Sequence, residues 1–176
     1  MEADWEVEIG GQAPVIQAQW AGFLDLRLAP ESAAQLPEAA QLPALADTLV
    51  RLNAPSSPVW TSKCDIWSPD TFDPDELDAP RGERNCAIAC YVDLLSRRDQ
   101  PWPDPEDAIA ACKTLCARLR YVALRRCRVD LVVRRASIAP GLLDLGVTAY
   151  FTACGSTSAD AAATLASALA AFVDSL

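Results

Sequence analysis

Residues 121–138 (YVALRRCRVDLVVRRASI) and residues 145–154 (LGVTAYFTAC) decide the fold that the sequence predicts. Apolar and polar residues alternate in both segments, which is typical of strands with one buried and one solvated face. The apolar positions are Cys127, Val129, Leu131, Val133, Leu145, Val147, Ala149, Phe151 and Ala153. Pro140-Gly141 between the segments suits the central positions of a type II turn. We therefore expect an antiparallel pair of strands at the centre of a sheet.

The rest of the chain repeats an arrangement of two strands followed by a helix. Further strands are expected over residues 4–9, 15–28, 59–67 and 86–95. Gly10-Gly11 suits a two-residue hairpin loop between the first two strands. Helices are expected to begin near Pro43, Asp104 and Ser158, because each position offers a proline or a side chain that can cap a helix.

This order, ββα-ββα-ββα, predicts an α+β fold in a single domain that spans residues 1–176. A six-stranded, mostly antiparallel sheet with helices packed on one face would bury every apolar strand face in a two-layer sandwich. The buried face is expected to include Trp60, Cys64 and Ile66. The solvated face is expected to include Arg126, Arg128 and Thr148.

The charge of the chain limits the class of partner. The formal net charge is −9 and the isoelectric point is about 4.4, which argues against a nucleic-acid-binding domain and favours a basic protein partner. No apolar run approaches the ~20 residues of a membrane span. The acidic beginning MEADWEVE differs from the basic start of a signal peptide. We therefore expect a cytoplasmic protein that does not associate with membranes.

One residue type that commonly carries catalysis is missing. The chain has no histidine, which removes the usual general base and the commonest imidazole metal ligand. Cys86-x3-Cys90 and Cys112-x3-Cys116 resemble two halves of a zinc site, but each pair lies on one face of a predicted strand or helix. We expect these thiols to pack in the core as small apolar groups, with neither a metal nor another cofactor bound.

The polar face of the predicted sheet offers one candidate site. Its candidate ligand-binding residues are Tyr91, Asp93, Arg128, Asp130 and Tyr150. Arginine and tyrosine are common in recognition surfaces, so this face could bind a small molecule or serve an enzyme. The alternative is a solvated face whose opposite charges form cross-strand ion pairs, which contribute only about 0.2–1 kcal/mol each.

An acidic segment offers a second candidate site. The candidate partner-binding residues are Trp67, Phe72, Asp73, Asp75, Glu76, Asp78 and Trp102. The carboxylates would steer a basic partner toward the segment, and the aromatic side chains would supply buried contact. The concrete hypothesis is a non-catalytic, immunity-type inhibitor of a basic toxin domain. A third hypothesis is a homodimeric structural subunit that pairs sheets or edge strands.

Overall fold

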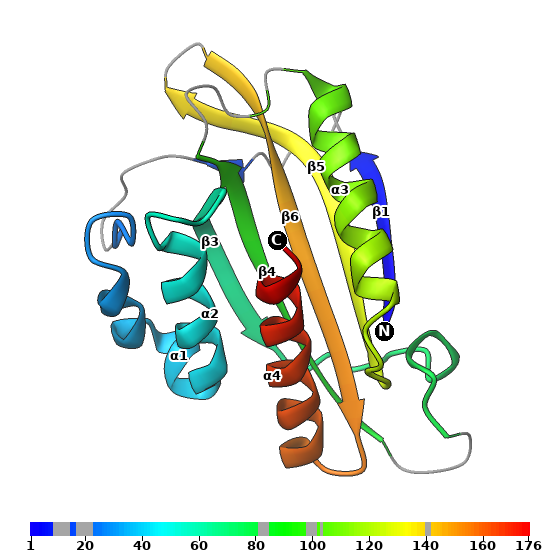
Figure 1. Ribbon diagram of the computed structural model, residues 1–176. Coiled ribbons are helices and arrows are strands. Elements are labelled where there is room, and N and C mark those ends of the chain that lie inside the picture. The colour runs from blue at the N-terminus through cyan, green and yellow to red at the C-terminus, as the bar shows by residue number, and fades with distance from the viewer. Residues whose placement is uncertain (9–14, 17–22, 81–84, 98–101, 103, 140–141) are drawn as a thin grey trace.

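The computed structural model describes residues 1–8, 15–16, 23–80, 85–97, 102, 104–139 and 142–176 (Figure 1). The strands are β1 (Glu2–Glu8), β2 (Val15–Ile16), β3 (Val59–Trp67), β4 (Cys86–Ser96), β5 (Cys127–Ala139) and β6 (Leu142–Gly155). The helices are η1 (Pro30–Gln35), α1 (Pro37–Gln41), α2 (Pro43–Asn53), η2 (Asp75–Leu77), α3 (Pro105–Arg120) and α4 (Ser158–Ser175). The predicted α+β class is confirmed.

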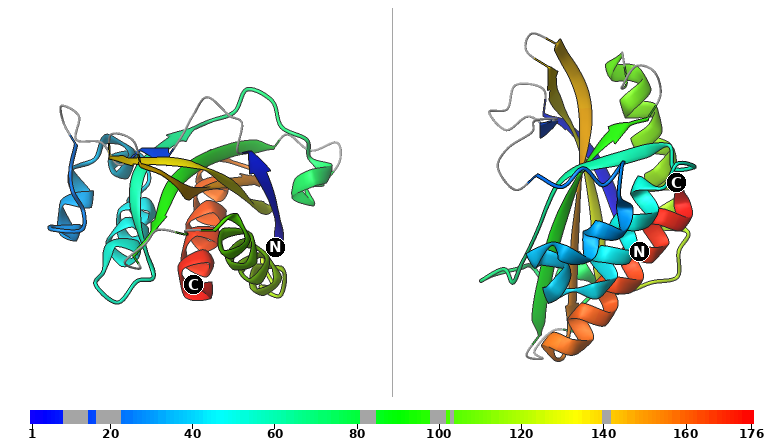
Figure 2. Two further views of the ribbon diagram at one scale, coloured as in Figure 1. Left: turned by 90° about the horizontal axis from the view of Figure 1, so that it is seen from above. Right: turned by 90° about the vertical axis from the view of Figure 1, so that its left-hand side faces the viewer.

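The sheet is mixed rather than mostly antiparallel. Five strands lie side by side in the order β1-β5-β6-β4-β3, and β2 pairs with the far end of β5. Pairs β5–β6, β6–β4 and β4–β3 are antiparallel, whereas β1 and β2 both run parallel to β5. Helices α2, α3 and α4 cover one face of this sheet, as Figure 2 shows from above, so the two-layer arrangement holds.

The predicted hairpin at the beginning of the chain is wrong. β1 and β2 run in the same direction along β5, so they cannot be the two arms of a hairpin. Of the strand expected over residues 15–28, only Val15–Ile16 is a strand among the described residues, and the chain turns at residues 26–28. Gly10-Gly11 and Pro140-Gly141 both lie outside the described residues. The alternation of apolar residues in β1 fitted either direction of pairing, because it reports a face and not a partner strand.

The core lies between the sheet and the three long helices. Leu131 and Val129 of β5 are fully buried, and Phe151 of β6 meets Phe172 of α4 edge-to-face at 5.0 Å. These positions confirm the predicted faces of the central strands. Helix α3 begins as expected, since the Asp104 carboxylate accepts a hydrogen bond from the Glu106 amide at 2.9 Å.

A β-bulge in β3 changes which side chains face the helices. The register with β4 shifts between Thr61 and Cys64, so the two residues between them lie opposite a single residue of β4. Cys64 and Ile66 face the helices as predicted. Trp60 does not, because it pairs with Leu95 and packs with it against Ala136 of β5 on the other face. The expectation that Trp60 shares a face with Cys64 is therefore wrong.

That second cluster curves the sheet. Ala136 belongs to β5 and Trp60 to β3, two strands that are separated by β6 and β4 in the sheet order. Because Trp60, Leu95 and Ala136 share one cluster, the end of β5 bends toward β4 and β3 on the face that α2, α3 and α4 leave uncovered, which we call the outer face; the yellow end of β5 can be followed in Figure 2. Thr148 on this face is only 1% exposed, so the prediction of its exposure is wrong.

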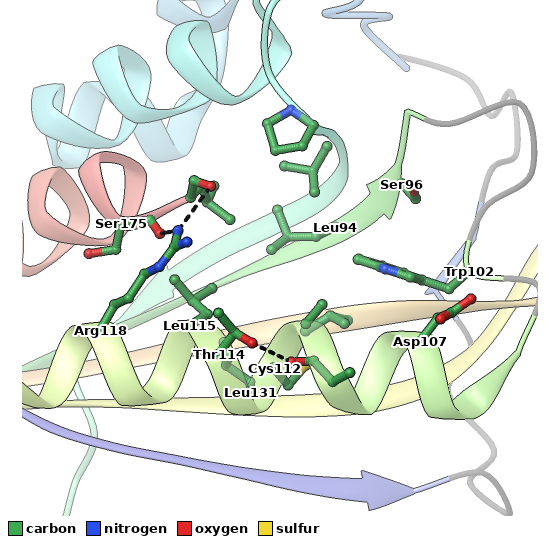
Figure 3. Close-up of a pocket in the computed structure, with 16 residues that line it drawn as sticks. Leu94, Ser96, Trp102, Asp107, Cys112, Thr114, Leu115, Arg118, Leu131 and Ser175 are labelled. Atoms are coloured by element: carbon green, nitrogen blue, oxygen red, sulfur yellow. Dashed lines mark hydrogen bonds between the residues drawn. The ribbon is translucent and has the colours of Figure 1, made fainter.

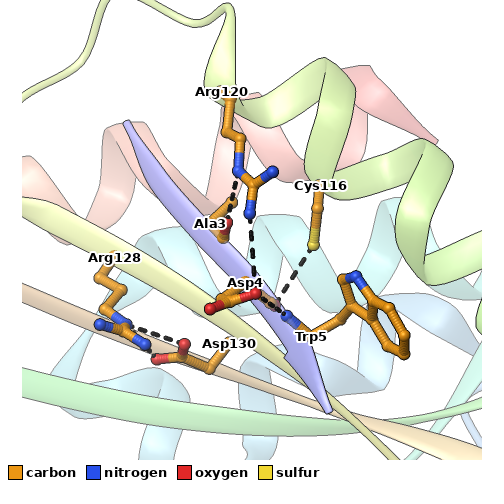
Figure 4. A network of polar contacts seen from close by, with 7 residues as sticks. All are labelled: Ala3, Asp4, Trp5, Cys116, Arg120, Arg128 and Asp130. Carbon is orange, nitrogen blue, oxygen red and sulfur yellow. Dashed lines mark hydrogen bonds and ion pairs between the residues drawn. The ribbon is translucent and has the colours of Figure 1, made fainter.

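The edge of the sheet at β1 is closed by helix α3 (Figure 4). Arg120 Nε donates a hydrogen bond to the Ala3 carbonyl at 2.8 Å, and Cys116 Sγ lies 3.2 Å from the Asp4 carbonyl. The Trp5 amide donates to the Asp4 carboxylate at 2.8 Å. Edge strands expose backbone groups that invite another strand, and these contacts occupy several of them. Within the described residues, no helix is long and apolar enough to span a membrane.

Candidate functional site

The outer face carries a row of aromatic side chains across three strands. Tyr150 of β6 lies directly opposite Tyr91 of β4, and their ring centroids are 5.9 Å apart. Trp67 at the end of β3 continues the row, with its ring 6.4 Å from Tyr91. The same register places Asp130 of β5 next to Tyr150. The structure thus brings Tyr91, Tyr150 and Asp130 together, as the candidate ligand face requires.

Two arginines of β5 lie on either side of Asp130. Arg128 Nε donates to both carboxylate oxygens of Asp130, at 2.8 and 2.9 Å. Arg134 holds its guanidinium 5.6 Å from the Tyr150 ring centroid and forms an ion pair with Glu8 of β1 at 2.7 Å. Arg128 is therefore neither fully exposed nor free. The outer face contains ion pairs, as the solvated-face alternative expected.

Asp93 is the most buried carboxyl group of the candidate ligand face. It is 6% exposed, and the Thr148 hydroxyl donates a hydrogen bond to it at 2.6 Å. Burial raises the pKa of Asp93, although the Thr148 hydrogen bond and the charges of Lys63 and Arg134 oppose the shift. Asp93 is thus enclosed by the protein.

A depression of about 410 Å³ lies between β1 and the aromatic row. Its walls include Asp4 and Glu6 of β1, Arg128 and Asp130 of β5, and Tyr150 of β6. Burial raises the pKa of Asp130, and the nearby charges of Asp4 and Glu76 add to this effect against Arg128. The depression is therefore lined by the carboxylates of Asp4, Glu6 and Asp130 together with the guanidiniums of Arg128 and Arg134.

The acidic segment, residues 72–79, packs against the outer face near the end of β6. Phe72 packs against Leu77, Ala79 and Cys154, and the Ala79 amide donates to the Pro74 carbonyl at 2.9 Å. The carboxylates of this segment point to solvent. The exposed members are Asp73, Asp75, Glu76 and Asp78. Phe72 thus anchors the segment instead of projecting from it, and Trp67, which is 39% exposed, is the aromatic side chain available beside it.

Trp102 is not part of this surface. It lies at the opposite end of β4 and lines a crevice of about 440 Å³ between α3 and the end of α4, on the helix-covered face (Figure 3). The crevice has an apolar floor made by Leu94, Leu131 and Val147, and Arg118 at its rim donates to the Ser175 carbonyl at 2.8 Å. The structure therefore separates Trp102 from the acidic segment with which the sequence analysis grouped it.

The four cysteines with metal-like spacing belong to packed elements. Cys90, Cys112 and Cys116 are buried in the main core, and Cys86 is half-buried in β4. Burial raises the pKa of the Cys112 thiol to about 12 and that of Cys116 to about 11. Thiolates are the form that attacks substrates and binds metals, so these side chains are poorly suited to either role. The absence of a bound metal stays a prediction.

Sequence reasoning missed Asp4, Glu6 and Arg134 as members of the site. Their polar alternation was visible, but the site needs β1 beside β5, which are more than a hundred residues apart. No local signal in the sequence reports that pairing. No family model, curated protein or solved structure matches the chain.

The outer face has polar groups that are already engaged within the protein. Its most buried carboxyl, Asp93, is occupied by Thr148, and Asp130 is held by Arg128. Burial raises the pKa of Tyr91 to about 12, so its hydroxyl keeps its proton at neutral pH. What the face presents to solvent is an aromatic floor with carboxylates along two sides. Such a surface can attract a cation and desolvate it against a ring.

Proposed function

We propose that the protein is a non-catalytic, cytoplasmic protein-binding module whose outer face docks a basic protein partner. The observation that carries this proposal is the aromatic row of Trp67, Tyr91 and Tyr150 on the sheet face that α2, α3 and α4 leave uncovered. Aromatic residues dominate the centres of protein interfaces, and charged residues belong to their rims.

Charge complementarity supports a basic partner. The carboxylates of β1 lie beyond Tyr150, across β5, and Glu76 of the acidic segment is close enough to act electrostatically on Arg128 and Asp130 of β5. With a net charge of −9, the protein would attract a basic partner from a distance and align it on this face. Phe72, Leu77 and Ala79 fix the acidic segment to the sheet, so the segment loses little freedom on binding.

The concrete form of the proposal is an immunity-type inhibitor. Such a protein works by covering a basic toxin domain and needs no catalytic group of its own. The uncovered face, the acidic rim and the lack of histidine are all compatible with this role. A homodimer that adds strands at β1 is less compatible, because α3 already occupies backbone groups of that edge.

The test is a comparison of outer-face variants in capture from the native lysate. The wild type should retain a basic protein, and Trp67→Ala combined with Tyr150→Ala should weaken its binding by about 30-fold, as expected for two interface anchors. Tyr121→Ala is the matched control, because Tyr121 is 92% exposed and follows α3 on the helix side. Urea unfolding of the variants should confirm that they are folded.

A basic partner whose binding is unaffected by the two outer-face substitutions would contradict the proposal. For the immunity role, the captured partner should be toxic when it is expressed alone and harmless when both proteins are expressed together. A partner that is harmless alone would remove that concrete form while the docking function remains.

A second candidate function is the binding of a small molecule, which the depression beside β1 favours. Its volume of about 410 Å³ falls in the range of ligand pockets, and Arg128, Asp130 and Tyr150 line it. A small molecule that raises the melting temperature of the wild type, but not of Tyr150→Ala, would support this candidate. Two members of the candidate ligand face, Tyr91 and Asp93, do not line the depression, because they belong to β4, on the far side of β6.

A further inference from the structure

The pairing of β1 with β5 leaves one group of like charges on the outer face. Along this ladder Glu2 lies opposite Arg128 and Glu8 lies opposite Arg134, which are matched pairs of charges. In the middle, however, Asp4 lies opposite Asp130, and Glu6 lies opposite the uncharged Val132. Like charges that face each other across neighbouring strands destabilise a sheet.

The protein's own cations only partly offset this group. Arg128 contacts Asp130 directly, but Arg120 reaches Asp4 only at 3.6 Å, with both side chains more than half exposed. An ion pair with that exposure contributes little. Glu6 is exposed on the wall of the depression. The carboxylates of Asp4, Glu6 and Asp130 therefore line a depression of about 410 Å³ together with Arg128 and Arg134, and the carboxylates outnumber the guanidiniums. Figure 4 shows Asp4 and Asp130 on their neighbouring strands.

The size and lining of the depression favour an organic cation over a metal ion. Within the described residues, no group of three or more histidine, cysteine, aspartate or glutamate side chains could hold a metal ion. A planar guanidinium can span separated carboxylates and stack on an aromatic ring, whereas an ammonium ion is a compact point charge. Arg134 already holds its guanidinium over the Tyr150 ring, so this ring accepts that type of contact.

We propose that the depression between β1 and Tyr150 receives the guanidinium of one arginine side chain presented by the basic partner. This inference rests on the proposed docking function and names the group that the partner inserts. The guanidinium would lie between Glu6, Asp4 and Asp130 and relieve their mutual repulsion. The aromatic row would then cover the aliphatic part of the arginine side chain.

The experiment uses Nα-acetyl-arginine methylamide as the probe and follows the backbone amides of the whole protein by NMR. Amide shifts should be largest near residues 4–6, 128–132 and 150. The neutral citrulline analogue has almost the same shape and should cause none of these shifts, and the lysine analogue should bind more weakly. Glu6→Gln and Asp130→Asn should each weaken binding of the arginine probe by about tenfold, since each removes one charge-assisted contact.

Asp47→Asn is the matched control, because Asp47 is an exposed carboxylate of α2 on the opposite face. It removes the same charge and should leave the arginine probe's affinity unchanged. Equal shifts with the citrulline analogue, equal affinity for the lysine analogue, or shifts centred on residues 70–78 would each overturn the inference. The spectra of the variants also report whether they are folded.

This test can fail separately from the proposed function. If the arginine probe binds in the depression but no basic partner is captured, the cation site stands and the docking function falls. If a basic partner is captured through Trp67 and Tyr150 but binds Glu6→Gln and Asp130→Asn as tightly as the wild type, the docking function stands and the arginine inference falls.

Discussion

Leu131 lies at the middle of the core, on the helix-facing side of β5, and is fully buried. Leu131→Ala should lower the free energy of unfolding by about 2–5 kcal/mol, because it removes buried apolar volume and leaves a cavity. Urea unfolding measures this change. Leu28→Ala is the control, since Leu28 is 84% exposed and its loss should alter stability by no more than about 0.5 kcal/mol. A similar effect in both variants would contradict the assigned face of β5.

Asp93 should make stability depend on pH in a defined direction. Burial raises its pKa in the folded protein above the ordinary value of 3.8, so the folded state favours the protonated carboxyl. The stability associated with that proton is fully present below pH 3.8 and is lost as the pH rises through the raised pKa. Asp93→Asn cannot ionise, and its amide oxygen can still accept the Thr148 hydrogen bond.

The measurement is the free energy of unfolding of Asp93→Asn and of the wild type at pH 4 and at pH 7. The variant should gain stability relative to the wild type between these two values, because only the wild type has to ionise a buried carboxyl. Thr148→Val removes the hydroxyl that stabilises the charged form of Asp93. This variant should therefore lose more stability than the wild type between pH 4 and pH 7. A difference that is the same at both pH values would contradict the raised pKa of Asp93.

For single residues, the sequence predicted the sheet face on which a side chain lies better than it predicted the exposed fraction of that side chain. Alternation placed Leu131 and Phe151 toward the helices, and both are buried. It placed Thr148 on the other face, which is correct, but the inference that Thr148 is exposed failed. The reason is that Thr148 lies opposite Val132 of β5 and its hydroxyl donates a hydrogen bond to Asp93 of β4, and local periodicity does not encode such neighbours.

At the scale of elements, Asn53 joins the end of α2 to β3. Its side-chain amide donates to the Leu49 carbonyl at 2.8 Å and to the Thr61 hydroxyl at 2.6 Å, and its oxygen accepts from the Thr61 amide at 3.1 Å. Asn53 is fully buried. Asn53→Ala should therefore cost about 1–3 kcal/mol, since it leaves buried backbone groups without partners.

Urea unfolding again provides the measurement for Asn53. Thr164→Ala is a suitable control, because Thr164 also bonds a helical carbonyl, that of Asp160 at 2.9 Å, but does so in solvent. The control should change stability by less than about 0.5 kcal/mol. If Asn53→Ala were equally mild, the join between α2 and β3 would contribute little to the fold.

The beginning of α3 followed from local chemistry, whereas the pairing of the strands did not. Asp104 and Pro105 marked the beginning of α3 because capping and proline preference act within one helical turn. The bulge in β3 arises where the strand must meet both Asn53 and β4, and no glycine or proline marks it. The parallel pairing of β1 with β5 and the depression beside it also could not be predicted, because no local sequence signal marks them.

At the scale of the whole molecule, the charge distribution is uneven. Carboxylates of β1 and of the acidic segment border the outer face, whereas arginines on the same face are already paired with Glu8 and Asp130. The net charge and the acidic segment were evident from the sequence. Their position beside Trp67 and Tyr91, and away from Trp102, depends on how the segment folds back onto Cys154. The face as assembled is what an approaching basic partner would encounter.

The acidic segment should therefore govern how fast a basic partner associates. Replacing Asp73, Asp75, Glu76 and Asp78 by their amides should slow association and flatten its dependence on salt, because long-range attraction is screened by ions. Dissociation should change little, since the anchors Trp67 and Tyr150 are retained. Stability should stay within about 0.5 kcal/mol, because these side chains are exposed.

Stopped-flow association with the captured partner at several salt concentrations measures both effects. The matched control neutralises four exposed carboxylates on the helix-covered side, namely Glu31, Asp47, Asp107 and Asp174. Both variants lose the same total charge, so a simple net-charge effect would slow them equally. Slower association in the acidic-segment variant alone would identify the segment as the guide for the partner. If both variants associate as fast as the wild type, the segment does not border the docking surface.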